Sequence, residues 1–298
     1  MRRAAAVVAL ALALAAGAPA QPRVTQVRVG AAPYRVTAIG RTLWVSVYGP
    51  GDVVRLDPAT GRVVRRYRVG GGPGSLAVAG GSVWIGNYAG NTLIRLDPRR
   101  RRIRHIAIGG EPIAVGSVGG AVWTADKGDG RVTKLSARTG KILLRRSFPS
   151  ESHEGLYATP TGIWVTSEGG IVHELDPASG KTKLTVRVGD DADYVLAAGG
   201  SIWVSCYLDQ SIWRLDPATG RVLQTIPVGT GAQGMALQGS TLWVANYDTG
   251  RLLRVDTTTG RVVESITSGR QPRAVALAGG SVWVANSGGS TVTRVRTG

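Results

Sequence analysis

Short runs of alternating hydrophobic and polar residues, broken by Gly, Asp, Asn and Thr, recur along almost the whole chain. Residues 228–266 show one full unit, in which turn residues separate the four β-rich runs MALQ, TLWVAN, RLLRVD and RVVESI. Alternation of this kind predicts short strands with one buried face. We therefore expect each unit to form four antiparallel strands.

Tryptophan marks the period of this pattern. Seven tryptophans stand 39 to 41 residues apart, each in the second run of its unit: Trp44, Trp84, Trp123, Trp164, Trp203, Trp243 and Trp283. A four-stranded blade cannot bury both faces without neighbours, so a four-strand repeat of this length is typical of a β-propeller. The sequence therefore predicts an all-β fold, a seven-bladed β-propeller over residues 21–298, with these tryptophans packed between blades.

The two ends of the repeat region complement each other. The seventh repeat stops after its third strand, whereas Arg23–Val27 resembles the fourth strand of another repeat, Arg261–Ile266. We expect the N-terminal strand to complete the last blade, which removes two open sheet edges. In such a ring, the loops from fourth to first strand and from second to third strand share one face, here called face one. The remaining turns share the opposite face, face two.

The first twenty residues are unlike the repeats. Two arginines precede an apolar run of Ala, Val and Leu, and Ala18-Pro19-Ala20 offers small residues for cleavage. This is the pattern of a secretory signal peptide. We expect residues 1–20 to be removed and the mature chain to be exported, to the periplasm or outside the cell, without a transmembrane segment.

Composition adds a strong positive charge and a lone thiol. The chain has 36 Lys and Arg against 19 Asp and Glu, a formal net charge of +17, and its apolar content of 43% excludes a disordered protein. Cys206 is the single cysteine, so no internal disulfide can form, and we expect the thiol to be packed.

Arginines cluster on the last turn and outer strand of the second repeat, at Arg99, Arg100, Arg101, Arg102 and Arg104. A basic rim of this kind can bind a polyanion such as single-stranded DNA, and binding would then weaken with salt. The same arginines can protect an exposed edge strand from aggregation. Both interpretations stay open. The basic region also includes Arg65, Arg66, Arg68, Arg145 and Arg146 of blades one and three, and Tyr67 is the only aromatic residue interleaved with its arginines.

Acidic and tyrosine residues gather in the segments expected on face one. Ten of the 19 carboxylates fall in loops of blades three to five: Glu111, Asp126, Asp129, Glu151, Glu154, Glu168, Asp190, Asp191, Asp193 and Asp209. Six of the eight tyrosines fall in or beside the loops of this face: Tyr34, Tyr48, Tyr88, Tyr194, Tyr207 and Tyr247. Crowded carboxylates repel unless a cation joins them, and tyrosine suits a ligand surface.

We therefore predict a site at the mouth of the central channel for an unidentified small molecule, peptide or protein. The residues chosen for it are Glu151, His153, Glu154, Glu168, Asp191, Asp193, Tyr194 and Tyr207. The fourth repeat contributes half of them: its first loop reads PSESHEG where other repeats have Val-Gly-x-x-Pro, and its next loop on this face carries Glu168. His153 stands where four other repeats have proline, eleven residues before the tryptophan.

The second strands read WVANY at 243–247, WIGNY at 84–88 and WVANS at 283–287. These strands resemble the YVTN-type repeat of exported seven-bladed propellers of the YncE kind, and the resemblance covers nearly the whole mature chain. It implies a binding or scaffold protein, and some members of this family are associated with single-stranded DNA. On this basis we expect a monomer with no required cofactor.

A more distant resemblance is to streptogramin (virginiamycin B) lyase, also a seven-bladed propeller. This resemblance implies an elimination that uses a His and a carboxylate-held metal at the channel mouth. His153 and Glu168 would be the catalytic candidates, and Glu151 and Glu168 would hold Mg²⁺ or Ca²⁺. Two features depart from the lyase pattern: its Trp-Phe-Thr-Glu strand is WVTS at 164–167, and His105 and His173 are expected on strands. A binding protein, a lyase and a polyanion-binding protein are thus the three alternatives.

Overall fold

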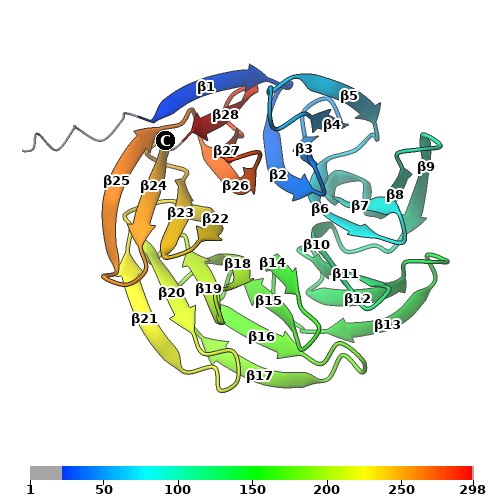
Figure 1. The fold of residues 1–298 in the computed structure, drawn as a ribbon. Helices are drawn as coiled ribbons and strands as arrows, with labels where there is room; N and C mark the ends of the chain where they lie inside the picture. The colour runs from blue at the N-terminus through cyan, green and yellow to red at the C-terminus, as the bar shows by residue number, and fades with distance from the viewer. Residues whose placement is uncertain (1–21, 297–298) are drawn as a thin grey trace, which may run out of the picture.

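The structure is a computed structural model that describes residues 22–296, and these residues form a closed ring of seven four-stranded sheets (Figure 1). Every sheet is antiparallel and runs from an inner strand at the channel to an outer strand at the rim. The predicted seven-bladed all-β propeller is confirmed. The signal peptide predicted for residues 1–20 lies outside the described residues.

The strands follow the chain blade by blade. Blade one contains β2 (Pro33–Ile39), β3 (Thr42–Val47), β4 (Asp52–Leu56) and β5 (Val63–Arg68). Blade two contains β6 (Pro73–Ala79), β7 (Ser82–Asn87), the 3₁₀ turn η1 (Tyr88–Gly90), β8 (Thr92–Asp97) and β9 (Arg102–Ala107). Blade three contains β10 (Pro112–Val118), β11 (Ala121–Asp126), β12 (Arg131–Ser136) and β13 (Ile142–Ser147). Blade four contains β14 (His153–Ala158), β15 (Ile163–Ser167), β16 (Ile171–Leu175) and β17 (Thr182–Arg187).

The second half of the ring repeats this order. Blade five contains β18 (Ala192–Ala198), β19 (Ser201–Cys206), β20 (Ser211–Leu215) and β21 (Val222–Pro227). Blade six contains β22 (Ala232–Gln238), β23 (Thr241–Asn246), β24 (Arg251–Asp256) and β25 (Arg261–Thr267). Blade seven contains β26 (Pro272–Ala278), β27 (Ser281–Asn286), β28 (Thr291–Arg296) and, from the other end of the chain, β1 (Arg23–Arg28).

The pairing of β1 with β28 closes the ring. The two strands are antiparallel in an unbroken register from Arg23 opposite Arg296 to Arg28 opposite Thr291. The N-terminal strand therefore completes the last blade, as the sequence predicts, and the sheet of blade seven holds both ends of the repeat region together (Figure 1).

The tryptophans of the series fill the space between blades. All seven are at most 3% exposed. Trp283 of blade seven packs in one apolar cluster with Leu43 and Val45 of blade one, and Trp44 of blade one packs with Ile85 of blade two. The predicted packing role is confirmed. Removing a buried tryptophan typically costs about 3–5 kcal/mol, so each of these seven positions contributes substantially to the stability of the ring.

A cation on the third strand covers several of these indoles and reaches the next blade. The Arg95 guanidinium lies 5.3 Å from the Trp84 ring centroid, and its Nη1 donates to the Arg138 carbonyl of blade three at 3.0 Å. At the closure, Arg294 lies 5.3 Å from the Trp283 ring and donates to the Ala59 carbonyl of blade one at 2.8 Å. These hydrogen bonds cross between blades on face two.

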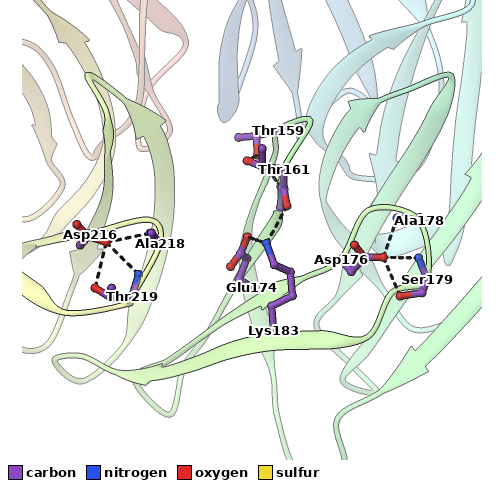
Figure 2. A network of polar contacts seen from close by, with 11 residues as sticks. Thr159, Thr161, Glu174, Asp176, Ala178, Ser179, Lys183, Asp216, Ala218 and Thr219 are labelled. Carbon is purple, nitrogen blue, oxygen red and sulfur yellow. Dashed lines mark hydrogen bonds and ion pairs between the residues drawn. The ribbon is translucent and has the colours of Figure 1, made fainter.

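Blade four departs from this arrangement (Figure 2). Glu174 takes the place of the cation, opposite Trp164, and accepts a hydrogen bond from Lys183 of the same blade at 2.6 Å. The flanking turns are conventional: Asp216 Oδ1 accepts from the backbone N–H groups of Ala218 and Thr219, both at 2.9 Å. These hydrogen bonds give the Asp of such face-two turns a structural role.

Two further sequence-based expectations concern the core and membranes. Cys206 is fully buried at the end of β19, and burial raises the pKa of its thiol, so the thiol is packed as expected. Over residues 22–296, no helix has the length and apolar character needed to span a bilayer.

Candidate ligand site at the channel mouth

A repeated backbone hydrogen bond builds face one. In each blade, the residue directly after the second strand donates its N–H to a carbonyl in the loop that enters the same blade, as Tyr48 does to Ala32 at 2.9 Å and Tyr247 to Gly231 at 2.7 Å. The two kinds of loop therefore share one face, as predicted. We call the donor positions the rim positions, and they are Tyr48, Tyr88, Lys127, Glu168, Tyr207, Tyr247 and Ser287.

Five of the seven rim positions line one cavity of about 330 Å³ at the channel mouth. They are Tyr48, Tyr88, Lys127, Tyr247 and Ser287, and Tyr34, Arg273, Gln271, Ile113, Ala32, Gly72 and Gly74 complete the wall. These residues come from blades one, two, three, six and seven. Ring closure thus brings together side chains from the two ends of the chain.

Tyrosine dominates this mouth cavity. Tyr34 and Tyr48 have ring centroids 6.4 Å apart, and the Arg273 guanidinium lies 4.3 Å from the Tyr34 centroid. Burial raises the pKa of Tyr34, so its phenol stays neutral at physiological pH. Arg273 also approaches Asp193, with 3.9 Å between Nη2 and Oδ1. The cavity therefore presents apolar rings, neutral hydroxyls and a cation that already has an acidic neighbour.

A second cavity of about 220 Å³ lies among the inner strands of blades one to five. Arg35 and Tyr194 both line it, and the Arg35 guanidinium lies 4.7 Å from the Tyr194 ring centroid. Tyr194, a predicted site residue, therefore belongs to this channel cavity, whereas its chain neighbour Asp193 approaches Arg273 of the mouth cavity.

Lys127 joins blades three and four at the edge of the mouth cavity. Its Nζ forms ion pairs with Glu154 and with Glu168, the latter at 2.8 Å. Burial, together with the nearby Asp193 carboxylate, raises the pKa of Glu154 to about 7. The hydrogen bond from Lys127 holds the pKa of Glu168 below its usual value. The cation of this cluster is thus shared between two predicted site residues.

The expectation that His153 and Glu154 lie in a loop is wrong. They are the first residues of β14, and they are 0% and 5% exposed. The proline that replaces His153 in four other blades also begins the inner strand, as Pro33 and Pro112 do, so the position belongs to the sheet. Asp193 on β18 and Asp126 on β11 were likewise assigned to loops and lie on strands.

His153 belongs to a cluster with His173, which is also buried, and with the partly buried Glu151 and Phe148. His173 Nε2 lies 3.0 Å from Glu151 Oε1, and Phe148 stacks on the His173 ring with 4.6 Å between centroids. His153 Nδ1 lies 4.0 Å from Glu151 Oε2, and neither of its ring nitrogens has a hydrogen-bond partner among residues 22–296. Burial lowers the pKa of His153, which keeps the ring neutral.

Glu151 and Glu168, the predicted metal ligands, have different partners. Glu151 contacts His173, whereas Glu168 contacts Lys127. His173 lies on β16, a strand, as expected, yet its ring reaches the loop that enters blade four. Within the described part of the chain, no group of three or more His, Cys, Asp or Glu side chains is arranged to hold a metal ion.

The remaining predicted residues lie beside the mouth cavity. The Tyr207 hydroxyl donates to Asp248 Oδ1 at 2.8 Å, and its ring lies 6.2 Å from that of Tyr247, which lines the cavity. Asp191 is half-buried in the loop before β18, and burial together with Asp193 raises its pKa to about 6. The Tyr207 ring therefore packs against the cavity wall from blade five.

Sequence reasoning missed Lys127 and Arg273, and it noted Tyr34, Tyr48, Tyr88 and Tyr247 without choosing them for the site. One signal was available. Tyr48, Tyr88, Lys127 and Tyr247 all directly follow the second strand, four residues after the tryptophan. That register position lines the mouth cavity in five of the seven blades.

Asp126 occupies the last place of the second strand, where Asn87, Asn246 and Asn286 stand in other blades. It is 0% exposed, accepts a hydrogen bond from Thr124 at 3.2 Å, and burial raises its pKa to about 8. The amides at this place join loops, as Asn246 Nδ2 does when it donates to the Val228 carbonyl at 3.1 Å. When protonated, the Asp126 carboxyl resembles that amide, because it is neutral and can donate a hydrogen bond.

Several solved structures share the fold. The virginiamycin B lyase of Staphylococcus aureus is 14% identical with a TM-score of 0.80, and the match covers 93% of this chain and 99% of that chain. Hydrazine synthase of Kuenenia stuttgartiensis is 18% identical with a TM-score of 0.78, and the match covers 90% and 96%. At these identities the likeness shows the fold alone.

No curated protein matches the chain. The YVTN-type assignment is not confirmed by any of the matches. The profile of the family described as outer membrane protein assembly factor BamB matches residues 23–155 and 128–297, which together span nearly all of the propeller. The chain therefore belongs to the outer membrane protein assembly factor BamB family.

Proposed function

We propose that this propeller is a non-catalytic binding or scaffold module whose ligand site is the mouth cavity. One observation carries the proposal: side chains from five blades converge on a single cavity of about 330 Å³ whose wall contains four tyrosines. Concave sites of this size with aromatic walls and few polar groups are typical of small-molecule or peptide binding. Tyrosine adds contact area with little loss of conformational entropy.

The charges around the cavity favour an uncharged, amphipathic ligand. Lys127 is paired with Glu154 and Glu168, and Arg273 lies near Asp193. An anionic ligand would have to break these pairs, and a cationic ligand would meet Arg273 and Lys127 themselves. A neutral ring or side chain avoids both costs and packs on the tyrosines.

Ligand-observed NMR with a panel of short uncharged peptides, monosaccharides and disaccharides tests this proposal. We expect at least one class to bind, and we expect Tyr88→Ser and Tyr247→Ser to abolish its signal. Leu208→Ser is the control, because Leu208 lies on the same face in blade five, is 65% exposed and does not line the cavity. A ligand whose signal persists in both tyrosine variants binds elsewhere and contradicts the proposal.

The lyase alternative has less support. It needs a histidine that can reach a bound substrate, and His153 is 0% exposed beneath Phe148 and Glu151. Incubation of the protein with virginiamycin B, followed by mass spectrometry, gives a direct test. Ring opening that His153→Ala abolishes would replace the binding proposal with a catalytic one.

We also infer that the protein is exported and acts in the cell envelope or outside the cell. The leader pattern of residues 1–20 supports this, and the name of its family refers to assembly at the outer membrane. Fractionation and N-terminal sequencing of the protein made in a bacterial host provide the test. A mature chain that begins at Gln21 is expected, and an intact Met1 in the cytoplasmic fraction would contradict export.

A further inference from the structure

A groove on blade two gathers several guanidinium groups. It shares no lining residue with the mouth cavity. It has a volume of about 280 Å³ and is lined by Ser82, Arg95, Asp97, Arg100, Arg102 and Arg104. Four arginines thus surround one carboxylate, on the face-two side of the outer strands. We call it the blade-two groove.

Two of these arginines stand directly opposite each other. In the register of β8 and β9, Arg95 pairs with Arg104, and like charges at such positions repel. Blade six has Arg254 opposite Glu264 at the same place, and the two side chains form an ion pair at 3.4 Å. Blade one has the same arrangement as blade two, with Arg55 opposite Arg65, so the internal counter-charge of blade six is absent from both.

The groove is preorganised around Arg95. Its Nε donates to Ser82 Oγ at 3.1 Å, its Nη1 donates to the Arg138 carbonyl at 3.0 Å, and its guanidinium lies over Trp84. These contacts hold the guanidinium in place before any ligand arrives. A fixed planar fork suits the oxygen atoms of a phosphate group.

The single carboxylate of the groove is already engaged. Asp97 Oδ1 accepts hydrogen bonds from the backbone N–H groups of Arg99 at 2.9 Å and Arg100 at 3.0 Å, and its Oδ2 pairs with the Arg100 guanidinium. These bonds hold the pKa of Asp97 low. Among residues 22–296, Arg102 and Arg104 form no ion pair, so their charge is available to a ligand.

The turn beside the groove keeps arginine at a strained position. Arg101 has φ of +57°, a left-handed conformation in which five other blades have glycine. Those glycines, with φ between 67° and 78°, are Gly61, Gly140, Gly180, Gly220 and Gly260. Glycine is the unstrained residue for this conformation. The turn of blade two therefore carries positive charge at a conformational cost.

We propose that the blade-two groove binds a phosphate or pyrophosphate group carried by a larger ligand. The aromatic surroundings favour a discrete phosphate over single-stranded DNA. Tyr67, the aromatic residue of this region, is 6% exposed and stacks on Trp44 with 5.6 Å between centroids. It therefore cannot serve as a stacking platform for bases, which single-stranded nucleic acid binding normally uses.

Isothermal titration of the full chain with pyrophosphate at low salt tests the proposal. The variant Arg104→Glu places at blade two the same pair as Arg254 and Glu264 in blade six, so the fold accommodates it. We expect pyrophosphate to bind the wild type, and Arg104→Glu to weaken binding about tenfold or more, because charge-assisted hydrogen bonds are lost. Arg261→Glu makes the same charge change on the outer strand of blade six and should leave the affinity unchanged.

Equal weakening of pyrophosphate binding by the two variants would overturn the proposal that the blade-two groove is the binding site, because it would show that net charge alone governs binding. Absence of pyrophosphate binding would also overturn it. Single-stranded oligonucleotide and anionic lipid vesicles form separate arms of the experiment. If either binds and pyrophosphate does not displace it, the arginines act as a diffuse polyanion surface and the discrete phosphate site is refuted.

Discussion

Asp126→Asn should stabilise the propeller at neutral pH. The wild-type carboxyl is fully buried, one of its oxygens has no hydrogen-bond partner among residues 22–296, and burial raises its pKa from 3.8 to about 8. The folded protein therefore keeps a proton that the unfolded chain releases above pH 4. Asparagine needs no proton and already fills this place at Asn87 and Asn286.

The size of the effect follows from the two pKa values. Where the folded state binds one proton more than the unfolded state, the free energy of unfolding falls by about 1.4 kcal/mol for each unit rise in pH. For Asp126 this window runs from about pH 4 to about pH 8. Between pH 5 and pH 7 the wild type should lose roughly 3 kcal/mol that Asp126→Asn keeps. For a domain of this size that corresponds to a difference of roughly 6 °C in melting temperature.

Thermal melting of both proteins at pH 5, 6 and 7 measures this difference. Glu154 and Asp191 also have raised pKa values and lower the stability in the same direction, but they are present in both proteins and cancel. Asp190→Asn is the control because it makes the same charge change at an exposed carboxylate, and it should leave the pH profile unchanged. Parallel profiles of melting temperature against pH for the wild type and Asp126→Asn would refute the inference that Asp126 is protonated in the folded protein.

Two further substitutions test the turns and the contacts between blades. Arg101→Gly should raise the free energy of unfolding by about 1 kcal/mol, because glycine adopts the φ of +57° without strain, and urea denaturation that shows no gain would contradict this. Arg294→Met should cost about 1.5 kcal/mol more than Arg214→Met in thermal melts, because both arginines cover a tryptophan but Arg294 also donates to the Ala59 carbonyl. Equal losses would show that this hydrogen bond between blades contributes nothing.

The ring itself could be predicted because its signals are local and repeated. Each tryptophan of the series of seven marks one blade, and the missing fourth strand of the last repeat matches the extra strand at Arg23–Val27. The sharing of face one by two kinds of loop follows from strand order alone. These features can be predicted from the alternation of apolar and polar residues within each blade and from the number of strands.

The site could be predicted only in part, because it depends on contacts between blades. His173 lies on a third strand, yet packing on Phe148 carries its ring to Glu151 in another loop. Asp126 is different, since its equivalence to Asn246 is visible in the sequence once the strands are in register. The mouth cavity joins blades one and seven, and its shape depends on how the blades tilt, which no local pattern encodes.

The two proposed sites differ in how their charge is balanced, and this separates them physically. At the mouth, Lys127 and Arg273 each lie beside carboxylates, so a ligand gains little from long-range attraction. In the blade-two groove, Arg102 and Arg104 lack that compensation, so an anion releases counterions when it binds. Binding at the mouth should therefore persist as salt rises, whereas binding in the groove should weaken steeply, because exposed charges are screened within about 10 Å at 0.1 M ionic strength. A ligand can thus be assigned to one site or the other before any variant is made.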